Sequence, residues 1–330
     1  MRPLLLALMA GVPAIASPAA ADPVVERTLD AVVLPAFDRF AAATAALAAA
    51  ARADCLAGSA PLRAAFHAAY DAWIPVSYFH AGPMEDGGRN LAIAFWPDPK
   101  GATPRTLRQL LARDAPLPPY ARVSVAARGL PALETMLYDP AFNGYGADDP
   151  GCRLVQAAAE DLAANGAALA AEWQGFAQAL RSAGPGNPRF LSVREARQLL
   201  FTALLGGLQF DDDQRLARPL GTFDRPRPER AEARESGRSL RNVQISLAAA
   251  RALAEALTSG HTEETFPALD YAIKVAARLD DPTFDAVATP VGRMKLQDLR
   301  DAVHRAREYA RVEIGAELGV SAGFNALDGD

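Results

Sequence analysis

Alanine is the feature of this sequence that most constrains its fold. The chain has 330 residues, of which 73 are alanine and only 7% are aromatic. Alanine has the highest intrinsic helix propensity, whereas β-sandwiches and barrels are rich in β-branched and aromatic side chains. No strand pattern of useful length is present. The composition therefore predicts an all-α protein with closely packed helices, long enough for one large domain or two smaller ones.

The first 21 residues have the three parts of a signal peptide. Arg2 precedes an almost wholly apolar run over residues 3–15, and an Ala-x-Ala cleavage site ends at Ala21. We expect cleavage after Ala21, with Ala16 as the second choice. An uncleaved membrane anchor is the alternative, but the apolar run is too short to cross about 30 Å of hydrocarbon. We therefore expect an exported, periplasmic protein without a membrane span.

The negative net charge of the chain argues against binding to nucleic acid. The sequence has 34 basic and 39 acidic residues, for a net charge of −5. Lysine occurs only three times, at Lys100, Lys274 and Lys295. Binding to a phosphate backbone depends on an excess of Lys and Arg, which this chain lacks.

Cys55 and Cys152 are the two cysteines of the chain. An even pair in an oxidising compartment predicts a disulfide. Both cysteines lie at predicted helix boundaries rather than inside an apolar stripe, which favours the bridge over two unrelated small apolar residues. Without nearby histidines the pair is a weak signal for zinc.

Proline and glycine clusters divide the chain into helical segments. The predicted helices span about 24–53, 61–81, 103–114, 120–127, 131–138, 152–182, 193–216, 229–259, 266–279 and 294–318. Each half begins with a long Ala-rich helix, then has a helix with apolar triplets and a loop with charged residues. We therefore predict two packed helical bundles, residues 22–150 and 151–320, and a frayed tail at 321–330. This similar order of helices and loops in the two halves is typical of an internal duplication. Chance similarity between Ala-rich helices is the alternative.

His80 and Glu134 are the first candidates for chemistry. His80 is followed by the acidic pair Glu85 and Asp86, although an ordinary hydrogen-bonded histidine is the competing interpretation. Glu134 lies in the predicted first turn of a short helix opened by Pro131. One interpretation of Glu134 is structural, because a carboxylate in the first turn interacts favourably with the helix dipole. The other is functional: the helix presents the carboxylate to a ligand.

Two later segments are also candidates. Three consecutive acids, residues 211–213, precede Arg215 and would bind a hard cation or form a solvated helix end. Glu235, Ser239 and Asn242 fall on one face of a predicted helix at spacings of four and three. The chain contains no zincin helix, P-loop, dinucleotide fingerprint or nucleophile elbow.

Five short stretches between about residues 70 and 240 occur in the order typical of one known family. They are Trp73 with Gly82-Pro83, Phe95-Trp96-Pro97, Arg128-Gly129 to Glu134, Arg215-Leu216 with Pro219-Leu220-Gly221, and Glu235-Ser236 through Ser239. With the signal peptide and the helical content, they make the chain resemble the imelysin family of bacterial envelope proteins. The resemblance implies an all-helical, two-bundle fold over about residues 24–318. It also implies a link to metal-dependent peptidase activity or to iron uptake.

The chain departs from the family's Gly-x-His-x-x-Glu motif at the histidine. Gly129 and Glu134 match its first and last positions, but Pro131 stands at the histidine position. A histidine and a glutamate three residues apart share a helix face and together bind a metal, whereas proline offers no ligand. His80 is the residue that could restore a ligand from another segment. The sequence therefore leaves three possibilities for a cofactor: iron, another divalent ion, or none.

The resemblance implies three functions. The first is a non-catalytic periplasmic binding protein linked to iron acquisition, which the missing histidine favours. The second is a metal-dependent peptidase, and the third is a structural module that docks onto an envelope protein. We expect no catalytic residues and a binding cleft where the two bundles meet. The expected cleft residues are His80, Arg128, Gly129, Glu134, Arg215, Glu235 and Ser239.

Overall fold

The computed structural model describes residues 22–260 and 262–321. The predicted signal peptide at 1–21 and the predicted tail beyond residue 321 lie outside the described residues. Within these two ranges the protein is all-α, as predicted, and an isolated bridge between Thr222 and Arg225 is the only extended pairing.

Loops and short 3-10 helices connect the α-helices, and two π-helical turns interrupt the helical runs. The α-helices are α1 (Pro23–Thr28), α2 (Leu34–Ala53), α3 (Ala60–Val76), α4 (Arg89–Ile93), α5 (Ala102–Leu111), α6 (Gly129–Tyr138), α7 (Pro150–Arg181), α8 (Val193–Phe210), α9 (Ala217–Leu220), α10 (Ser239–Leu257), α11 (Thr265–Ala277) and α12 (Pro290–Leu318). The π-helical turns span Leu29–Val33, between α1 and α2, and Asp211–Leu216, between α8 and α9.

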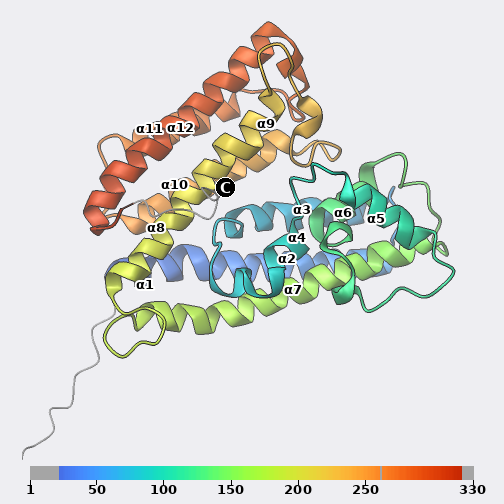
Figure 1. The fold of residues 1–330 in the computed structure, drawn as a ribbon, viewed down its shortest axis with the longest axis horizontal. Coiled ribbons are helices and arrows are strands. Elements are labelled where there is room, and N and C mark those ends of the chain that lie inside the picture. Colours follow the sequence, from blue (N-terminus) through green and yellow to red (C-terminus); the bar gives the residue numbers. More distant parts are fainter. Residues whose placement is uncertain (1–21, 261, 322–330) are drawn as a thin grey trace, which may run out of the picture.

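Helices α1 to α7 form the first group, drawn from blue to green in the lower half of Figure 1. Helix α2 packs along both α3 and α7. Aromatic rings fill the space between them: Phe37 stacks on Trp173 with ring centroids 4.6 Å apart. Small residues allow close approach, because a Cβ at Gly166 of α7 would lie 2.4 Å from Thr44 Oγ1 of α2. The first group thus includes α7, which begins at Pro150 and occupies the start of the range expected for the second bundle.

Helices α8 to α12 form the second group, coloured yellow to red in Figure 1. Helix α12 packs against α11 and α8, and α10 packs against α8 and α11. The groups meet where α3 contacts α10 and where α1 contacts α8 and α10. Two packed helical groups agree with the predicted architecture, whereas an internal duplication stays a prediction.

The first long helical run contains a π-helical turn directly before Pro35. The backbone N–H of Leu34 donates to the carbonyl of Leu29, five residues back. Proline has no N–H to donate, so a local change of helical winding beside it is expected. Among the described residues, the run Pro23–Ala53 is the one helix long and apolar enough to cross a membrane. It packs against α3 and α7, as a core helix does.

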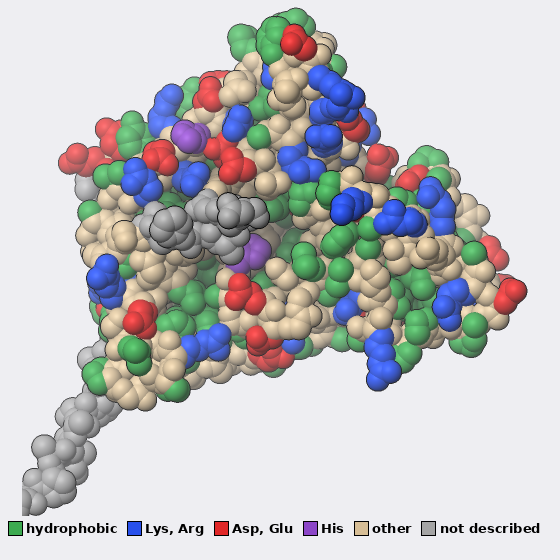
Figure 2. Space-filling view, in the orientation of Figure 1, with side chains coloured by type: hydrophobic (Ala, Val, Ile, Leu, Met, Phe, Trp, Pro, Cys, Tyr) green, Lys and Arg blue, Asp and Glu red, His purple; other side chains and the backbone are tan. Residues whose placement is uncertain are grey.

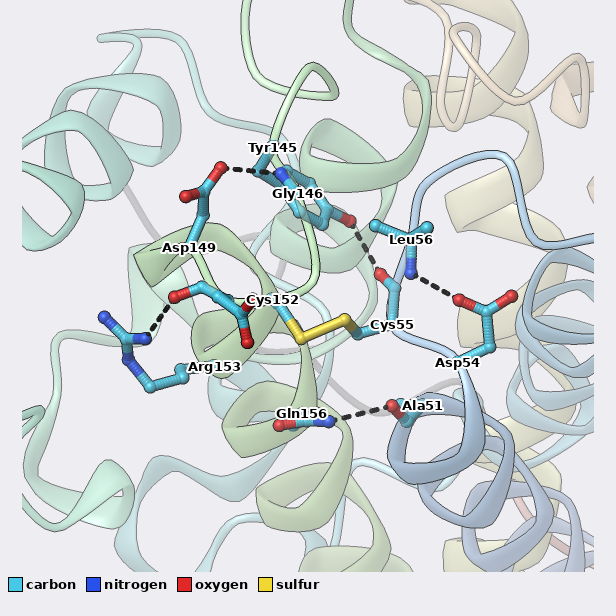
Figure 3. Close-up of a disulfide and its surroundings, with 11 residues drawn as sticks. Ala51, Asp54, Cys55, Leu56, Tyr145, Gly146, Asp149, Cys152, Arg153 and Gln156 are labelled. Carbon is cyan, nitrogen blue, oxygen red and sulfur yellow. Dashed lines mark hydrogen bonds between the residues drawn. A yellow bond between two sulfur atoms is a disulfide. The ribbon is translucent and has the colours of Figure 1, made fainter.

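Cys55 and Cys152 form the predicted disulfide (Figure 3). Their Cα atoms are 5.2 Å apart, within the normal range for a bridge. The bond ties the loop after α2 to the first turn of α7. Tyr145 supports it by donating a hydrogen bond of 3.1 Å from its hydroxyl to the Cys55 carbonyl.

The prediction of a helix from residue 229 is wrong over its first ten residues, because α10 begins only at Ser239. The segment 228–238 consists of a short 3-10 helix, Pro228–Arg230, followed by turns. Ala233 and Gly237 have φ values of +51° and +69°, in the left-handed region that a right-handed helix excludes. The irregular segment instead carries Glu232 and Ser236 to the junction between the two groups.

Candidate functional site

A cavity of about 300 Å³ lies where the two groups of helices meet. The first group contributes the end of α3 and the segment after it, together with residues 90–97. The second group contributes the end of α8, the π-helical turn that follows it, and Glu232. The lining includes Trp73, Tyr78, His80, Trp96, Phe210, Gln214, Arg215 and Glu232. The cavity is therefore mainly aromatic and apolar, with a few polar groups.

A buried ion-pair network closes one side of the cavity. The Arg215 side chain is 2% exposed, and its Nη1 lies 2.8 Å from Asp211 Oδ1 while its Nε lies 2.7 Å from Glu232 Oε2. Asp211 and Arg215 are four residues apart in the π-helical turn. The network thus joins this turn to the irregular segment 228–238.

Helix α10 and the first group complete the network. Asn242 donates to Glu232 at 2.9 Å, and Ser246 Oγ donates to Asp211 Oδ2 at 2.5 Å. Tyr78, from the segment after α3, donates its hydroxyl proton to the Ser246 carbonyl. Neutral side chains of α10 therefore hold the buried carboxyl groups in place, and Tyr78 links α10 to the first group.

Burial and neighbouring charges set the protonation of the network. Burial raises the pKa of Asp211 to about 6, although Arg215 opposes this shift. Burial alone would lower the pKa of Arg215, but the carboxylates of Glu232 and Asp211 raise it above its usual value. Arg215 is thus a permanent cation held between two carboxyl groups.

Glu134 is buried and contacts the same irregular segment. Its Oε1 accepts hydrogen bonds from the Ser236 backbone N–H at 2.9 Å and from Ser236 Oγ at 2.7 Å. Burial raises the pKa of Glu134 to about 7, and the charges of Glu232 and Glu235 act in the same direction. The expectation that Glu134 lies in the first turn of its helix is wrong. Helix α6 begins at Gly129, which makes Pro131 its third residue.

Arg128 and Gly129 have structural roles away from the cavity lining. Arg128 makes two hydrogen bonds of 2.9 Å to the buried Asp161 of α7. Gly129 has φ +68°, and a Cβ there would lie 2.1 Å from the Ile93 carbonyl oxygen. Only glycine permits this backbone approach, which explains the glycine at the first position of α6.

Glu235 and Ser239 do not share the helix face expected for them, because α10 begins at Ser239. The Glu235 side chain is exposed and lies 3.4 Å from Arg234. Ser239 is buried, and its Oγ has no hydrogen-bond partner among the described residues. The structure thus brings His80 and Arg215 to one cavity, whereas Glu134 contacts Ser236 in the irregular segment. It leaves Arg128, Gly129, Glu235 and Ser239 outside the lining.

His80 is exposed on the cavity wall. The protein around it lowers the pKa of its imidazole by desolvation, and the charge of Glu85 acts in the opposite direction. A lowered pKa keeps the ring neutral at pH 7, so His80 offers both a donor and an acceptor to a molecule in the cavity.

The residues present do not fit a resident catalytic metal. Among residues 22–260 and 262–321, no three His, Cys, Asp or Glu side chains come together as a possible ligand set. Glu134 accepts hydrogen bonds from Ser236, and Pro131 supplies no ligand atom. A hydrolytic zinc site needs three protein ligands and an open position. The described donors therefore do not provide such a site.

Sequence reasoning missed part of the network. The spacing of Asp211 and Arg215, four residues apart on a helix, was a usable signal for an ion pair. The roles of Tyr78 and Ser246 had no signal, because they depend on packing between segments 168 residues apart.

The fold and the cavity define a class: an all-α protein of two helical groups with an aromatic cavity between them. The imelysin family model matches residues 33–309, and the chain belongs to this family. No curated protein sequence gives a significant match.

Two solved structures share the fold. An imelysin-like protein from Psychrobacter arcticum 273-4 is 20% identical, with a TM-score of 0.72, covering 92% of this chain and 99% of that one. A protein of Parabacteroides distasonis ATCC 8503, described as a "putative iron-regulated protein A precursor", is 14% identical. Its TM-score is 0.69, and the match covers 87% of this chain and 93% of that one.

Proposed function

We propose that this protein is an exported, non-catalytic binding protein of the periplasm that takes up an iron-containing ligand. The cavity between the two groups of helices is the observation that carries this proposal. Small-molecule sites are typically concave and mostly apolar, with a few fixed polar groups, and they occur preferentially between domains. Here Trp73, Trp96 and Phe210 form walls, while His80 and Arg215 supply polar atoms.

Rigidity supports a binding role. Arg215 is fixed by Asp211 and Glu232 before any ligand arrives, and Tyr78 is fixed by Ser246. A ligand that enters such a cavity does not have to order the polar groups around it, so little of its binding free energy is lost.

The link to iron and to export has separate support. One protein with this fold carries the words "iron-regulated" and "precursor" in its description. The predicted signal peptide and the disulfide both suit an oxidising compartment outside the cytoplasm. A metal-dependent peptidase is the second candidate because the family model is named for one. It predicts chelator-sensitive cleavage of an unfolded protein substrate, whereas our proposal predicts none.

Filling the cavity tests the proposal directly. Gly206 of α8 lines the cavity, and a Cβ built there meets no atom within 4 Å. Gly206→Leu should therefore place a side chain in the cavity and still favour the helix, because glycine is a weak helix former. Gly175→Leu is the matched control, since Gly175 is an exposed helical glycine of α7 whose Cβ also meets no atom within 4 Å.

Equilibrium dialysis with iron quantified by elemental analysis measures the outcome. The probes are Fe²⁺, ferric citrate and a ferric hydroxamate chelate without carboxylates. We expect the wild type and Gly175→Leu to retain at least one probe, and Gly206→Leu to lose at least tenfold in affinity for it. Failure of all three probes to bind the wild type would refute iron binding and leave docking onto an envelope partner as the stronger hypothesis.

A further inference from the structure

Arg218, which contacts the cavity residue Trp96, and the exposed Arg230 lack the acidic partners that Arg215 and Arg227 have. Arg215 is held by two carboxylates and Arg227 lies 3.3 Å from Glu229. By contrast, neither Arg218 of α9 nor Arg230 makes an ion pair or a side-chain hydrogen bond with any described residue. Desolvation lowers the pKa of Arg218, and the positive charge of Arg230 lowers it further.

Arg218 is half-buried, and its Nε is buried without a hydrogen-bond partner within the described part of the chain. A partly desolvated cation next to a second cation is unfavourable unless an anion compensates it. Residues 217–230 contain four arginines but only two acidic residues, so the local sequence does not balance this positive charge. On the face drawn in Figure 2, Lys and Arg side chains gather where the upper group of helices meets the lower one.

Trp96 connects Arg218 to the cavity. The Arg218 guanidinium carbon lies 5.7 Å from the centroid of the Trp96 ring, and the same ring lines the cavity. The contact fixes the cation at the edge of the cavity without neutralising it. A molecule that lies against Trp96 inside the cavity can therefore extend a negatively charged group to Arg218.

We propose that Arg218 and Arg230 bind the carboxylate groups of an anionic iron chelate whose body lies in the cavity against Trp96. This inference rests on the proposed iron-binding function and names its substrate class. The described residues supply no three-ligand set for a bare ion, so the iron must bring its own ligands. Arginine is suited to carboxylates because its planar guanidinium donates two parallel hydrogen bonds.

The experiment compares chelates and arginine variants in the mature full-length protein. Ferric citrate, iron-free citrate and a ferric hydroxamate without carboxylates are titrated into the wild type, Arg218→Gln and Arg230→Gln. Arg194→Gln is the control, because Arg194 is exposed near the start of α8, roughly 35 Å away along the helical run. Far-ultraviolet circular dichroism verifies that every variant is folded.

We expect ferric citrate to bind most tightly, and each of the two arginine substitutions to weaken it about tenfold or more. Arg194→Gln should leave its affinity unchanged. Equal binding of the hydroxamate chelate, or unchanged ferric citrate affinity in Arg218→Gln and Arg230→Gln, would overturn the anion site while leaving iron binding intact. Equal binding of iron-free citrate would overturn the assignment to an iron chelate. Binding of no probe would overturn the proposed function itself.

Discussion

Glu134 should make the stability of this protein fall as the pH rises. Its carboxyl group is buried, and burial raises its pKa from 4.5 to about 7 in the folded state. Below pH 4.5 the group is protonated in both the folded and the unfolded chain, so it contributes no penalty. Above pH 7 it is ionised in both states, and the folded protein must hold a buried negative charge. The difference between the two pKa values corresponds to about 3 kcal/mol of stability lost across this range.

The substitution Glu134→Gln removes the titration and keeps the acceptor. A glutamine oxygen can accept the two hydrogen bonds that Ser236 donates to Glu134 Oε1. We therefore expect the variant to match the wild type within about 1 kcal/mol near pH 4.5 and to exceed it by about 3 kcal/mol at pH 8. Asp211 also has a raised pKa, but it is present in both proteins and cancels in the difference.

Urea unfolding at pH 4.5, 6, 7 and 8, followed by circular dichroism, measures this difference. Glu235→Gln is the control, because Glu235 is exposed beside Ser236 and acts on Glu134 only through its charge. The control should follow the wild-type pH profile closely. An equal loss of stability in Glu134→Gln at every pH would refute the reasoning, since a difference independent of pH would show that the pKa of Glu134 is not raised on folding.

Two further substitutions test the scaffold. Replacing Cys55 and Cys152 by alanine removes a disulfide between residues 97 positions apart. From loop entropy alone we expect the free energy of unfolding, measured in urea, to fall by about 4–5 kcal/mol. A loss under about 1 kcal/mol would show that the bridge does not restrict the unfolded chain. Gly129→Ala should destabilise the protein by at least about 2 kcal/mol, because φ +68° and a Cβ 2.1 Å from the Ile93 oxygen are both unfavourable. Gly175→Ala, in an open helical position, should be neutral or stabilising in the same assay.

The fold was predictable because local propensity and hydrophobic pattern agree along most of the chain. The Ala-rich runs became α2, α7 and α10, and the breaker cluster around Gly184 separates α7 from α8. The exception is the segment 228–238. Its sequence is charged and has the spacing of a helix, but left-handed residues at 233 and 237 fold it into turns. Propensity cannot reveal this, because tertiary contacts of Glu232 and Ser236 determine the conformation.

The candidate site was less predictable than the fold. His80 and Arg215 were candidates because of their polarity, and both line the cavity. Glu235 was a candidate because of an assumed helix, and the structure gives it an exposed side chain instead. The aromatic walls could not be assigned in advance, since a tryptophan in an Ala-rich helical protein looks the same whether it faces the core or a cavity.

Arginine has two different roles at the junction of the helical groups. Arg215 is 2% exposed, and its charge is balanced by carboxylates that belong to the protein, so it fixes the cavity wall. Arg218 follows one helical turn later, lies against Trp96 and has no carboxylate partner among the described residues. If stability alone had determined these residues, an uncharged side chain at 218 would avoid the repulsion from Arg230. An anionic ligand in the cavity would offset the cost of keeping the partly buried Arg218 cation without a carboxylate partner.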